Sequence, residues 1–242
     1  MPPRSPELTK DKSVVVPGIQ QSIVYVDSIL RRTSGDGVPG PGQRSQDCGF
    51  SADLFNYAFN SWAENSSVPI DRPAFCTSIW MIHALADHPN DPEAVPQILV
   101  NYSQAISEGD YQGQRVSDYQ QYSSTFQHEV SIIKDGDRTY LADLTFCQFV
   151  GQDRTISEGK GKSPLSVDQS AVAQQLLAEN YIELTPQNLP ELLRLTSTNG
   201  FDEKYQHLSP ESCAQIIQNI QPSTPGFTNS ELQRYLAAPV AA

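Results

Sequence analysis

Two residues capable of acid–base chemistry, His128 and Asp143, flank a segment whose pattern predicts a β-hairpin. The runs Phe-Gln-His-Glu-Val-Ser-Ile-Ile-Lys and Arg-Thr-Tyr-Leu-Ala-Asp-Leu-Thr-Phe lie on either side of Asp135-Gly136, a dipeptide typical of tight hairpin turns. If this dipeptide forms the centre of the turn, His128 and Asp143 face each other with Cβ atoms about 4.5–5.5 Å apart. A carboxylate at that distance can orient an imidazole ring for catalysis. An ordinary cross-strand pair is the alternative, and a bulge would break the register.

A histidine that is oriented by an aspartate can activate a thiol or a hydroxyl group. The chain has no Gly-x-Ser-x-Gly motif, so its four cysteines are the better candidates. Cys48 follows a segment rich in Gly, Pro and Ser and precedes a helix predicted over residues 51–62. The positive end of that helix would lower the pKa of the thiol, and its free amides could stabilise an oxyanion. We therefore expect Cys48 to be the nucleophile.

Cys76 is the second candidate nucleophile, because it lies in the first turn of a helix predicted over residues 73–86. Its apolar neighbours favour a packing role, which is the commoner fate of a cysteine in such surroundings. Cys147 follows the second predicted strand and Cys213 lies on an apolar helix stripe, so both are interpreted as packing residues. The cysteines form no Cys-x-x-Cys pair, and we expect neither a metal site nor a cofactor.

The order of these residues resembles the papain-like cysteine enzyme superfamily. A cysteine starts a helix, a histidine lies on a strand, and after a tight turn comes Asp-Leu-Thr-Phe-Cys-Gln-Phe, which begins at Asp143. The likeness is to bacterial toxin and effector members, among them protein-glutamine deamidases and cysteine proteases, whose pattern is often Asp-Pro-Thr-x-x-Gln-Phe. Leu144 replaces that proline. The resemblance covers about residues 42–150 and implies a triad of Cys48, His128 and Asp143.

The elements around the hairpin are predicted to be helices. Apolar residues repeat at helical spacing in residues 13–30, where a strand remains the alternative, and another helix is expected from Asp91-Pro92. Residues 108–125 show no periodicity and are interpreted as a long polar loop. From residue 166 onward the chain is predicted to be helical, with N-caps at Ser166, Thr185, Ser209 and Thr228.

This order of helices, hairpin and helices, without βαβ alternation, predicts an α+β fold. The expected architecture is papain-like, with an antiparallel β-sheet or hairpin packed against helices and a C-terminal helical region. Residues 1–47 would form an N-terminal segment and loop, residues 48–150 the catalytic core, and residues 151–242 the helical region. All three parts are expected to belong to one compact domain.

The composition excludes several classes of function. The chain has 242 residues, and its 16 Lys+Arg against 28 Asp+Glu give a formal net charge of −12. A surface this acidic repels phosphate groups, which argues against nucleic acids and anionic membranes as partners. No apolar run reaches the roughly 18–20 residues of a membrane span, and the start lacks the apolar core of a secretory signal. We expect a cytoplasmic protein, or one exported to a target cell by a route without a readable signal.

These observations together predict a thiol-dependent amide hydrolase that acts on protein or peptide substrates. The triad does not distinguish a protein-glutamine deamidase from a cysteine protease, nor either of them from a transglutaminase-like acyltransferase, since pocket shape decides among these reactions. The alternative is a non-catalytic, acidic interaction module with a papain-like shell, whose surface would suit a basic protein partner.

Overall fold

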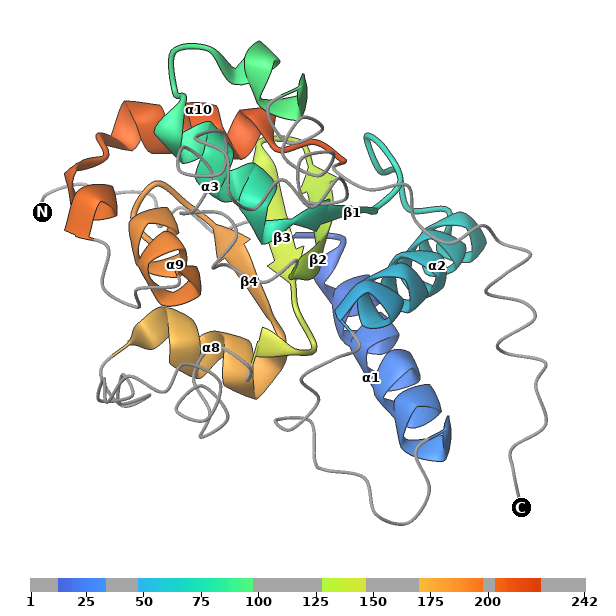
Figure 1. Cartoon of the computed structure of the whole chain (residues 1–242). Helices are drawn as coiled ribbons and strands as arrows, with labels where there is room; N and C mark the ends of the chain where they lie inside the picture. Colours follow the sequence, from blue (N-terminus) through green and yellow to red (C-terminus); the bar gives the residue numbers. More distant parts are fainter. Residues whose placement is uncertain (1–12, 34–47, 98–127, 147–169, 198–202, 223–242) are drawn as a thin grey trace, which may run out of the picture.

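The computed structural model describes residues 13–33, 48–97, 128–146, 170–197 and 203–222 (Figure 1). Every structural statement below refers to these ranges. The loop predicted over residues 108–125, the caps predicted at Ser166 and Thr228, and Cys147 lie outside them. Within the described ranges, no helix combines the length and the apolar character needed to cross a membrane.

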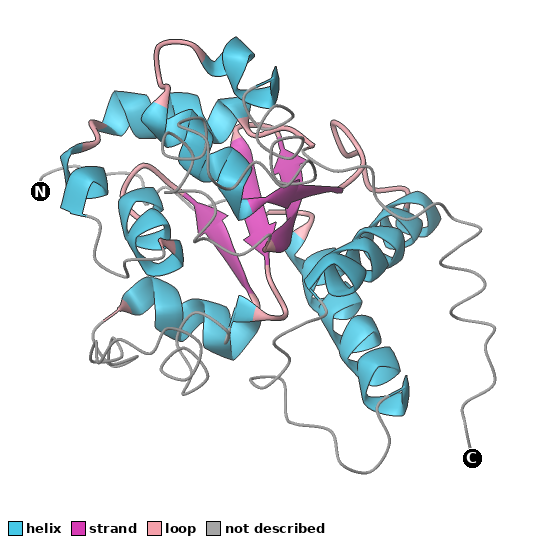
Figure 2. Ribbon diagram, viewed as in Figure 1, coloured by secondary structure: helices cyan, strands magenta, loops and turns pink. Residues whose placement is uncertain are grey.

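A four-stranded antiparallel sheet forms the centre of the fold (Figure 2). Its strands lie side by side in the order of the sequence: β1 (Phe75–Ser78), β2 (Glu129–Asp135), β3 (Arg138–Ala142) and β4 (Tyr181–Leu184). Helices cover both faces, which explains why β2 and β3 are buried along most of their length instead of alternating between buried and exposed residues. The fold is therefore α+β, as predicted.

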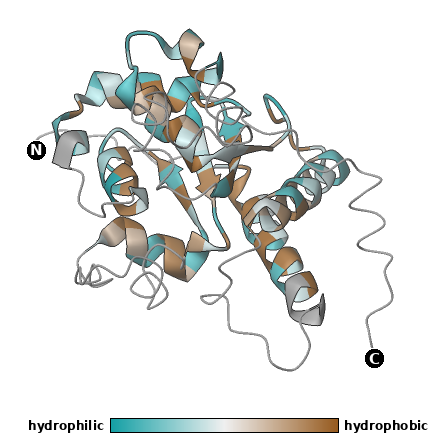
Figure 3. Cartoon of the chain, in the orientation of Figure 1, coloured by the Kyte–Doolittle hydropathy of each residue, from teal (hydrophilic) through white to brown (hydrophobic). Residues whose placement is uncertain are grey.

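One face of the sheet carries the larger hydrophobic core. Ile132, Leu141 and Ile182 are register partners on β2, β3 and β4, and all three lie in this core. Figure 3 shows hydrophobic residues on the strands and on parts of the helices beside them. This face is covered by α3 (Ile79–Asp87), α8 (Ala171–Glu179), α9 (Leu189–Thr196) and α10 (Pro210–Asn219).

The opposite face packs on two long helices, α1 (Val16–Thr33) and α2 (Cys48–Ser66), which lie against each other in Figure 1. Ile133 and Tyr140, which are register partners on β2 and β3, lie in a second core with apolar side chains of both helices. The sheet is thus the middle of three layers, and α2 approaches it from the side opposite to α3.

Several helices confirm their sequence signals. α1 confirms the helix predicted over residues 13–30 and excludes the strand alternative. α10 begins at the predicted Ser209-Pro210 pair, where the Ser209 hydroxyl accepts a hydrogen bond from the Ser212 N–H at 3.1 Å. After Asp91, a short 3-10 helix (η2, Pro92–Ala94) begins as predicted, although the Asp91 side chain makes no cap hydrogen bond.

The prediction of a helix over residues 73–86 is wrong for the first half of that range. Residues 75–78 form β1, which pairs with β2, and the helix begins only at Ile79. Ser78 is its cap and accepts a hydrogen bond from the Trp80 N–H at 3.1 Å. A short apolar run next to a helix has no periodicity of its own, so only the pairing with β2 decides its conformation. Cys76 therefore lies on a strand.

The prediction that the chain is helical from residue 166 onward is wrong for part of this region. Residues 181–184 form β4, which pairs with β3 and brings this region into the central sheet. The helix predicted to start at Thr185 begins instead at Leu189, after Asn188. Another short 3-10 helix (η5, Glu203–His207) precedes α10.

The predicted hairpin is confirmed, but its turn lies one residue further along the chain. Asp135 pairs with Arg138, so the two central residues of the turn are Gly136 and Asp137. Gly136 has a φ of 57° and Asp137 has no positive φ, which is the pattern of a type II′ turn with glycine at its first central position. The direct opposition of His128 and Asp143 that the sequence predicted is therefore wrong.

Candidate active site

His128 and Asp143 nevertheless meet, at the end of the sheet where β2 begins and β3 ends. The His128 Nε2 and the Asp143 Oδ2 lie 2.6 Å apart, and both side chains are buried. Moving the turn by one residue changes each cross-strand partner by two positions, which makes these residues diagonal neighbours on the same side of the hairpin. Side chains of diagonal neighbours can still reach each other, so His128 and Asp143 are in contact although the predicted register is wrong.

The carboxylate of Asp143 is held on both of its oxygens. Its Oδ1 accepts hydrogen bonds from the backbone N–H of Thr145 at 2.9 Å and from the Thr145 hydroxyl at 3.2 Å. The backbone N–H of Asp143 donates to the carbonyl of Asn180 at 2.8 Å. Asn180 ends α8 in the left-handed conformation, with a φ of 59°. These contacts leave Oδ2 aimed at the imidazole.

His128 is fixed through its backbone as well as its ring. It directly precedes β2, and its carbonyl accepts a hydrogen bond at 2.8 Å from the N–H of Ile79, the first residue of α3. Its side chain is fully buried. Because Nε2 is engaged by Asp143, Nδ1 is the ring nitrogen that remains for a second partner.

That second partner is Cys48, the first residue of α2. The Cys48 sulfur is hydrogen-bonded to the His128 side chain and to the backbone of Glu129. The N-terminal part of α2 is held against the sheet, because the buried Ser131 hydroxyl of β2 donates a hydrogen bond to the carbonyl of Ala52, the fifth residue of the helix, at 3.0 Å. The structure thus brings the three residues of the predicted triad into one hydrogen-bonded chain.

The electrostatics of this chain favour a thiolate beside an imidazolium. Burial raises the pKa of the Cys48 thiol, but the hydrogen bond and charge of His128, with the Glu129 backbone N–H, outweigh it and lower that pKa below its usual 9.0. Burial lowers the pKa of His128, but Asp143 and Cys48 outweigh it and raise that pKa to about 9. Both shifts favour the reactive form of a catalytic cysteine.

Cys76, the second candidate, lies in very different surroundings. Its buried sulfur accepts a hydrogen bond from Asn56 Nδ2 at 3.0 Å and donates one to Asp53 Oδ1 at 3.1 Å. Burial, followed by the charge of Asp53, raises the pKa of Cys76 far above its usual value. A thiol that is used as a hydrogen-bond donor to a carboxylate stays protonated, so this site favours a structural role.

Two further residues with reactive side chains, Cys213 and His83, have structural roles in the described part of the chain. Cys213 is buried in the larger core. His83 bonds through both ring nitrogens, to the Tyr205 hydroxyl at 2.7 Å and to the Thr196 hydroxyl at 2.9 Å. In the described part of the chain, no group of three or more His, Cys, Asp or Glu residues is placed to hold a metal ion.

Two residues that the sequence did not indicate, Glu129 and Ser51, also lie around the triad. Glu129, immediately after His128, lies with its carboxylate against Gly49: a Cβ on Gly49 would meet the Glu129 Oε2 at 2.8 Å. Ser51, in the first turn of α2, is buried and its hydroxyl has no hydrogen-bond partner among the described residues. The signals that could have indicated the first contact were a glycine after the cysteine and a glutamate after the histidine.

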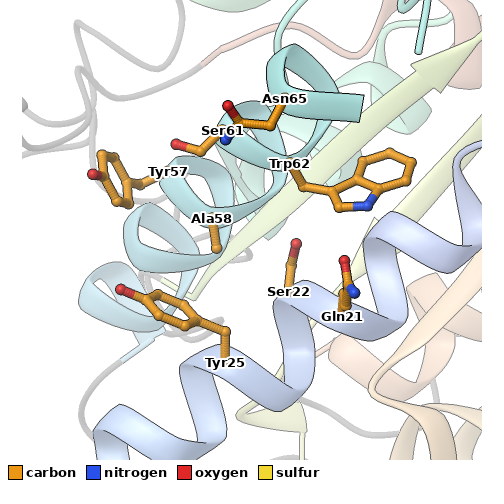
Figure 4. A pocket seen from close by; sticks show the side chains of 8 residues that line it. All are labelled: Gln21, Ser22, Tyr25, Tyr57, Ala58, Ser61, Trp62 and Asn65. Carbon is orange, nitrogen blue, oxygen red and sulfur yellow. The ribbon is translucent and has the colours of Figure 1, made fainter. Parts of the chain in front are cut away.

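An open pocket of about 450 Å³ lies between α1 and α2 (Figure 4). It is lined by Gln21, Ser22, Tyr25, Tyr57, Ala58, Ser61, Trp62 and Asn65. None of these residues belongs to the triad, so this pocket is separate from the candidate active site.

Comparisons with known proteins found no match, whether with protein-family models, with curated proteins or with solved structures. A function can therefore be inferred only from the arrangement of the residues themselves.

Proposed function

We propose that this protein is a cysteine-dependent amide hydrolase that acts on protein substrates. The observation that carries the proposal is the chain of hydrogen bonds from the half-buried Cys48 through the buried His128 to the buried Asp143. Each group has the surroundings that its role requires: a thiol at a helix N-terminus, an imidazole between thiol and carboxylate, and a carboxylate with every oxygen occupied. A papain-like arrangement, as the sequence resemblance implies, belongs to the same proposal.

The first half of the reaction would form an acyl-enzyme. The Cys48 thiolate attacks the carbonyl carbon of the amide, and the carbonyl oxygen becomes an oxyanion near the start of α2. Helix N-termini carry N–H groups without a partner inside the helix, which suit a developing negative charge. The carbon–nitrogen bond then breaks, the His128 imidazolium gives its proton to the leaving nitrogen, and a thioester on Cys48 remains.

The second half would release the acyl group. A water molecule gives a proton to the neutral His128 and attacks the thioester carbon. The carbon–sulfur bond breaks, the product leaves as a carboxylic acid, and the thiolate–imidazolium pair is restored. Ammonia as the leaving group defines a glutamine deamidase, and a peptide amine defines a protease. An amine in place of water would give a transglutaminase.

Cysteine labelling tests the activated thiol. The native protein is treated with iodoacetamide at mildly acidic pH, and the modified cysteines are identified by mass spectrometry. Cys48 should react faster than Cys76 and Cys213, because only its pKa is lowered. Equal rates for these three cysteines would contradict the proposal.

A comparison of products tests the reaction. Wild type and Cys48→Ala are incubated with a mixture of proteins, and the peptides are compared by mass spectrometry. Conversion of glutamine to glutamate indicates a deamidase, new peptide ends a protease, and amine adducts of glutamine a transglutaminase. If labelling is unselective and wild type forms no product that Cys48→Ala lacks, the non-catalytic interaction module becomes the better interpretation.

A further inference from the structure

We propose that Glu129 makes the Cys48 site selective for amides that carry a positive charge beside the reacting carbonyl. This inference rests on the proposed function and adds a substrate class to it: proteins with a basic residue next to the target amide. It concerns a residue that the mechanism above does not use as acid, base or nucleophile.

The position of Glu129 is the first argument. It is the first residue of β2, and its backbone N–H is bonded to the Cys48 sulfur while its carboxylate lies against Gly49, the residue after the nucleophile. An alanine at position 49 would bring its Cβ to 2.8 Å from the Glu129 Oε2. A substrate bound to Cys48 therefore lies within a residue's length of a carboxylate.

The Glu129 carboxylate also opposes the formation of a thiolate at Cys48. Its negative charge raises the pKa of Cys48, against the effect of His128. The charge of Glu129 also raises the pKa of Cys76. A site that needed only a reactive thiolate would be better served by a neutral residue at this position. A role toward the substrate explains the acid where a role toward the nucleophile does not.

The distribution of charge along the sheet is the third argument. The basic residues of β2 and β3, Lys134 and Arg138, lie at the hairpin turn, and Glu129 lies at the other end of β2. Lys134 lies five positions after Glu129 on β2, which is about 17 Å at the usual rise per residue. The net charge of −12 adds a long-range attraction for cationic substrates.

Charged thiol reagents test the proposal on the native protein. Methanethiosulfonates with a trimethylammonium, a sulfonate or an uncharged methyl group are reacted with the full chain, and the rate at Cys48 is followed by mass spectrometry. Each rate is divided by the rate of the same reagent with a small free thiol. We expect the cationic reagent to be favoured over the anionic one by about tenfold or more, as one charge in partly exposed surroundings provides.

Three variants identify the source of that preference. Glu129→Gln should reduce the ratio of cationic to anionic rates several-fold, and Glu129→Lys should invert it. Gly49→Ala should reduce it too, because the new Cβ displaces the carboxylate. Glu211→Gln, which removes an exposed acid in the first turn of α10, is the matched control and should leave the ratio unchanged.

The uncharged reagent separates this inference from the proposed function. If it prefers Cys48 but the charge ratio is the same in wild type and Glu129→Gln, Glu129 does not select charge and the inference is wrong, while the activated thiol stands. If the uncharged reagent shows no preference for Cys48, the proposed function fails whatever the charge ratio is.

Discussion

The two carboxylate oxygens of Asp143 have different hydrogen-bond partners. These partners determine how an asparagine at this position would orient its amide group. The two donors of Thr145, its N–H and its hydroxyl, both meet Oδ1. An asparagine would turn its carbonyl oxygen toward these donors and its NH2 group toward His128. The ring nitrogen Nε2 would then have to accept a hydrogen bond, and the imidazolium would lose its stabilising partner.

Asp143→Asn should therefore lower the alkylation rate of Cys48 at mildly acidic pH, and the rate of amide hydrolysis by about 10²–10⁴-fold, the range of a general acid–base contribution. Circular dichroism checks that the variant is folded. Thr145→Ser, which keeps both donors, is the matched control and should retain most of the rate. A fully active Asp143→Asn would show that the carboxylate does not orient the ring.

His128 should titrate far from the usual range of histidine. Its pKa is raised from 6.5 to about 9, because Asp143 and Cys48 outweigh the effect of burial. The charged ring therefore contributes stability that is complete below about pH 6.5 and is lost as the pH rises through about 9. An NMR titration of the ring should show its midpoint near pH 9, and a lower one in Asp143→Asn. A wild-type midpoint at or below 6.5 would contradict the charged pair.

At the scale of single residues, the sequence indicates the three residues of the proposed triad, which the structure brings together, but it does not indicate their surroundings. Cys48, His128 and Asp143 have side chains whose chemistry is recognisable in any sequence. The contacts of Glu129 with Gly49 and of Asp143 with Asn180 join segments that are far apart in the chain. No local pattern encodes such contacts, because they depend on how α2 and β4 dock on the hairpin.

At the scale of elements, the hairpin turn sets the alignment of the site. The N–H of Gly136 donates to Asp71 Oδ2 at 2.8 Å, and its φ of 57° is one that side-chain-bearing residues rarely adopt. A Cβ at this position would meet nothing within 4 Å, so a substitution meets no steric clash with neighbouring residues. The cost of an alanine here is purely conformational.

Gly136→Ala should lower the free energy of unfolding by about 1–2 kcal/mol, the cost of a left-handed backbone for an L-residue. Chemical denaturation measures this change. Asp137→Ala, the exposed neighbour in the same turn, is the control and should change stability by less than about 0.5 kcal/mol. Equal effects of the two substitutions would mean that the positive φ is not the cause.

The elements that the sequence predicted well carry their own end signals. Ser209-Pro210 marks the start of α10 because a hydroxyl cap and a proline act locally. β1 and β4 have only four residues each, and their conformation is decided by partners elsewhere in the chain. The predicted turn is one residue too early for a related reason: Asp-Gly and Gly-Asp are both acceptable turn dipeptides, and the packing of β2 selects between them.

At the scale of the whole molecule, the charge of −12 should act on the approach of substrates. Raising the ionic strength from about 0.01 M to about 1 M shortens the screening length from about 30 Å to about 3 Å. The rate of the cationic methanethiosulfonate at Cys48 should fall several-fold over this range, while that of the uncharged reagent stays nearly constant. The same salt dependence for both reagents would exclude electrostatic attraction.

The three residues of the proposed triad are synthesised in a fixed order. Cys48 lies on a helix of one layer, and His128 and Asp143 follow much later in the chain, on the hairpin of the middle layer. A ribosome therefore makes the proposed nucleophile long before the histidine that would activate it. Until the hairpin has formed and α2 has docked on it, Cys48 should react as an ordinary thiol, because neither His128 nor the Glu129 backbone lies beside it.

Because its reactivity depends on the docking of α2, Cys48 should report unfolding by a loss of reactivity, which is the opposite of what most buried thiols do. Most buried thiols react faster when a protein unfolds, and Cys76 and Cys213 should follow that rule at mildly acidic pH as denaturant is added. Cys48 should do the opposite and lose reactivity, because unfolding removes His128 from its side. Iodoacetamide labelling across a denaturation curve, read cysteine by cysteine, measures both trends, and a Cys48 that gains reactivity on unfolding would refute the dependence.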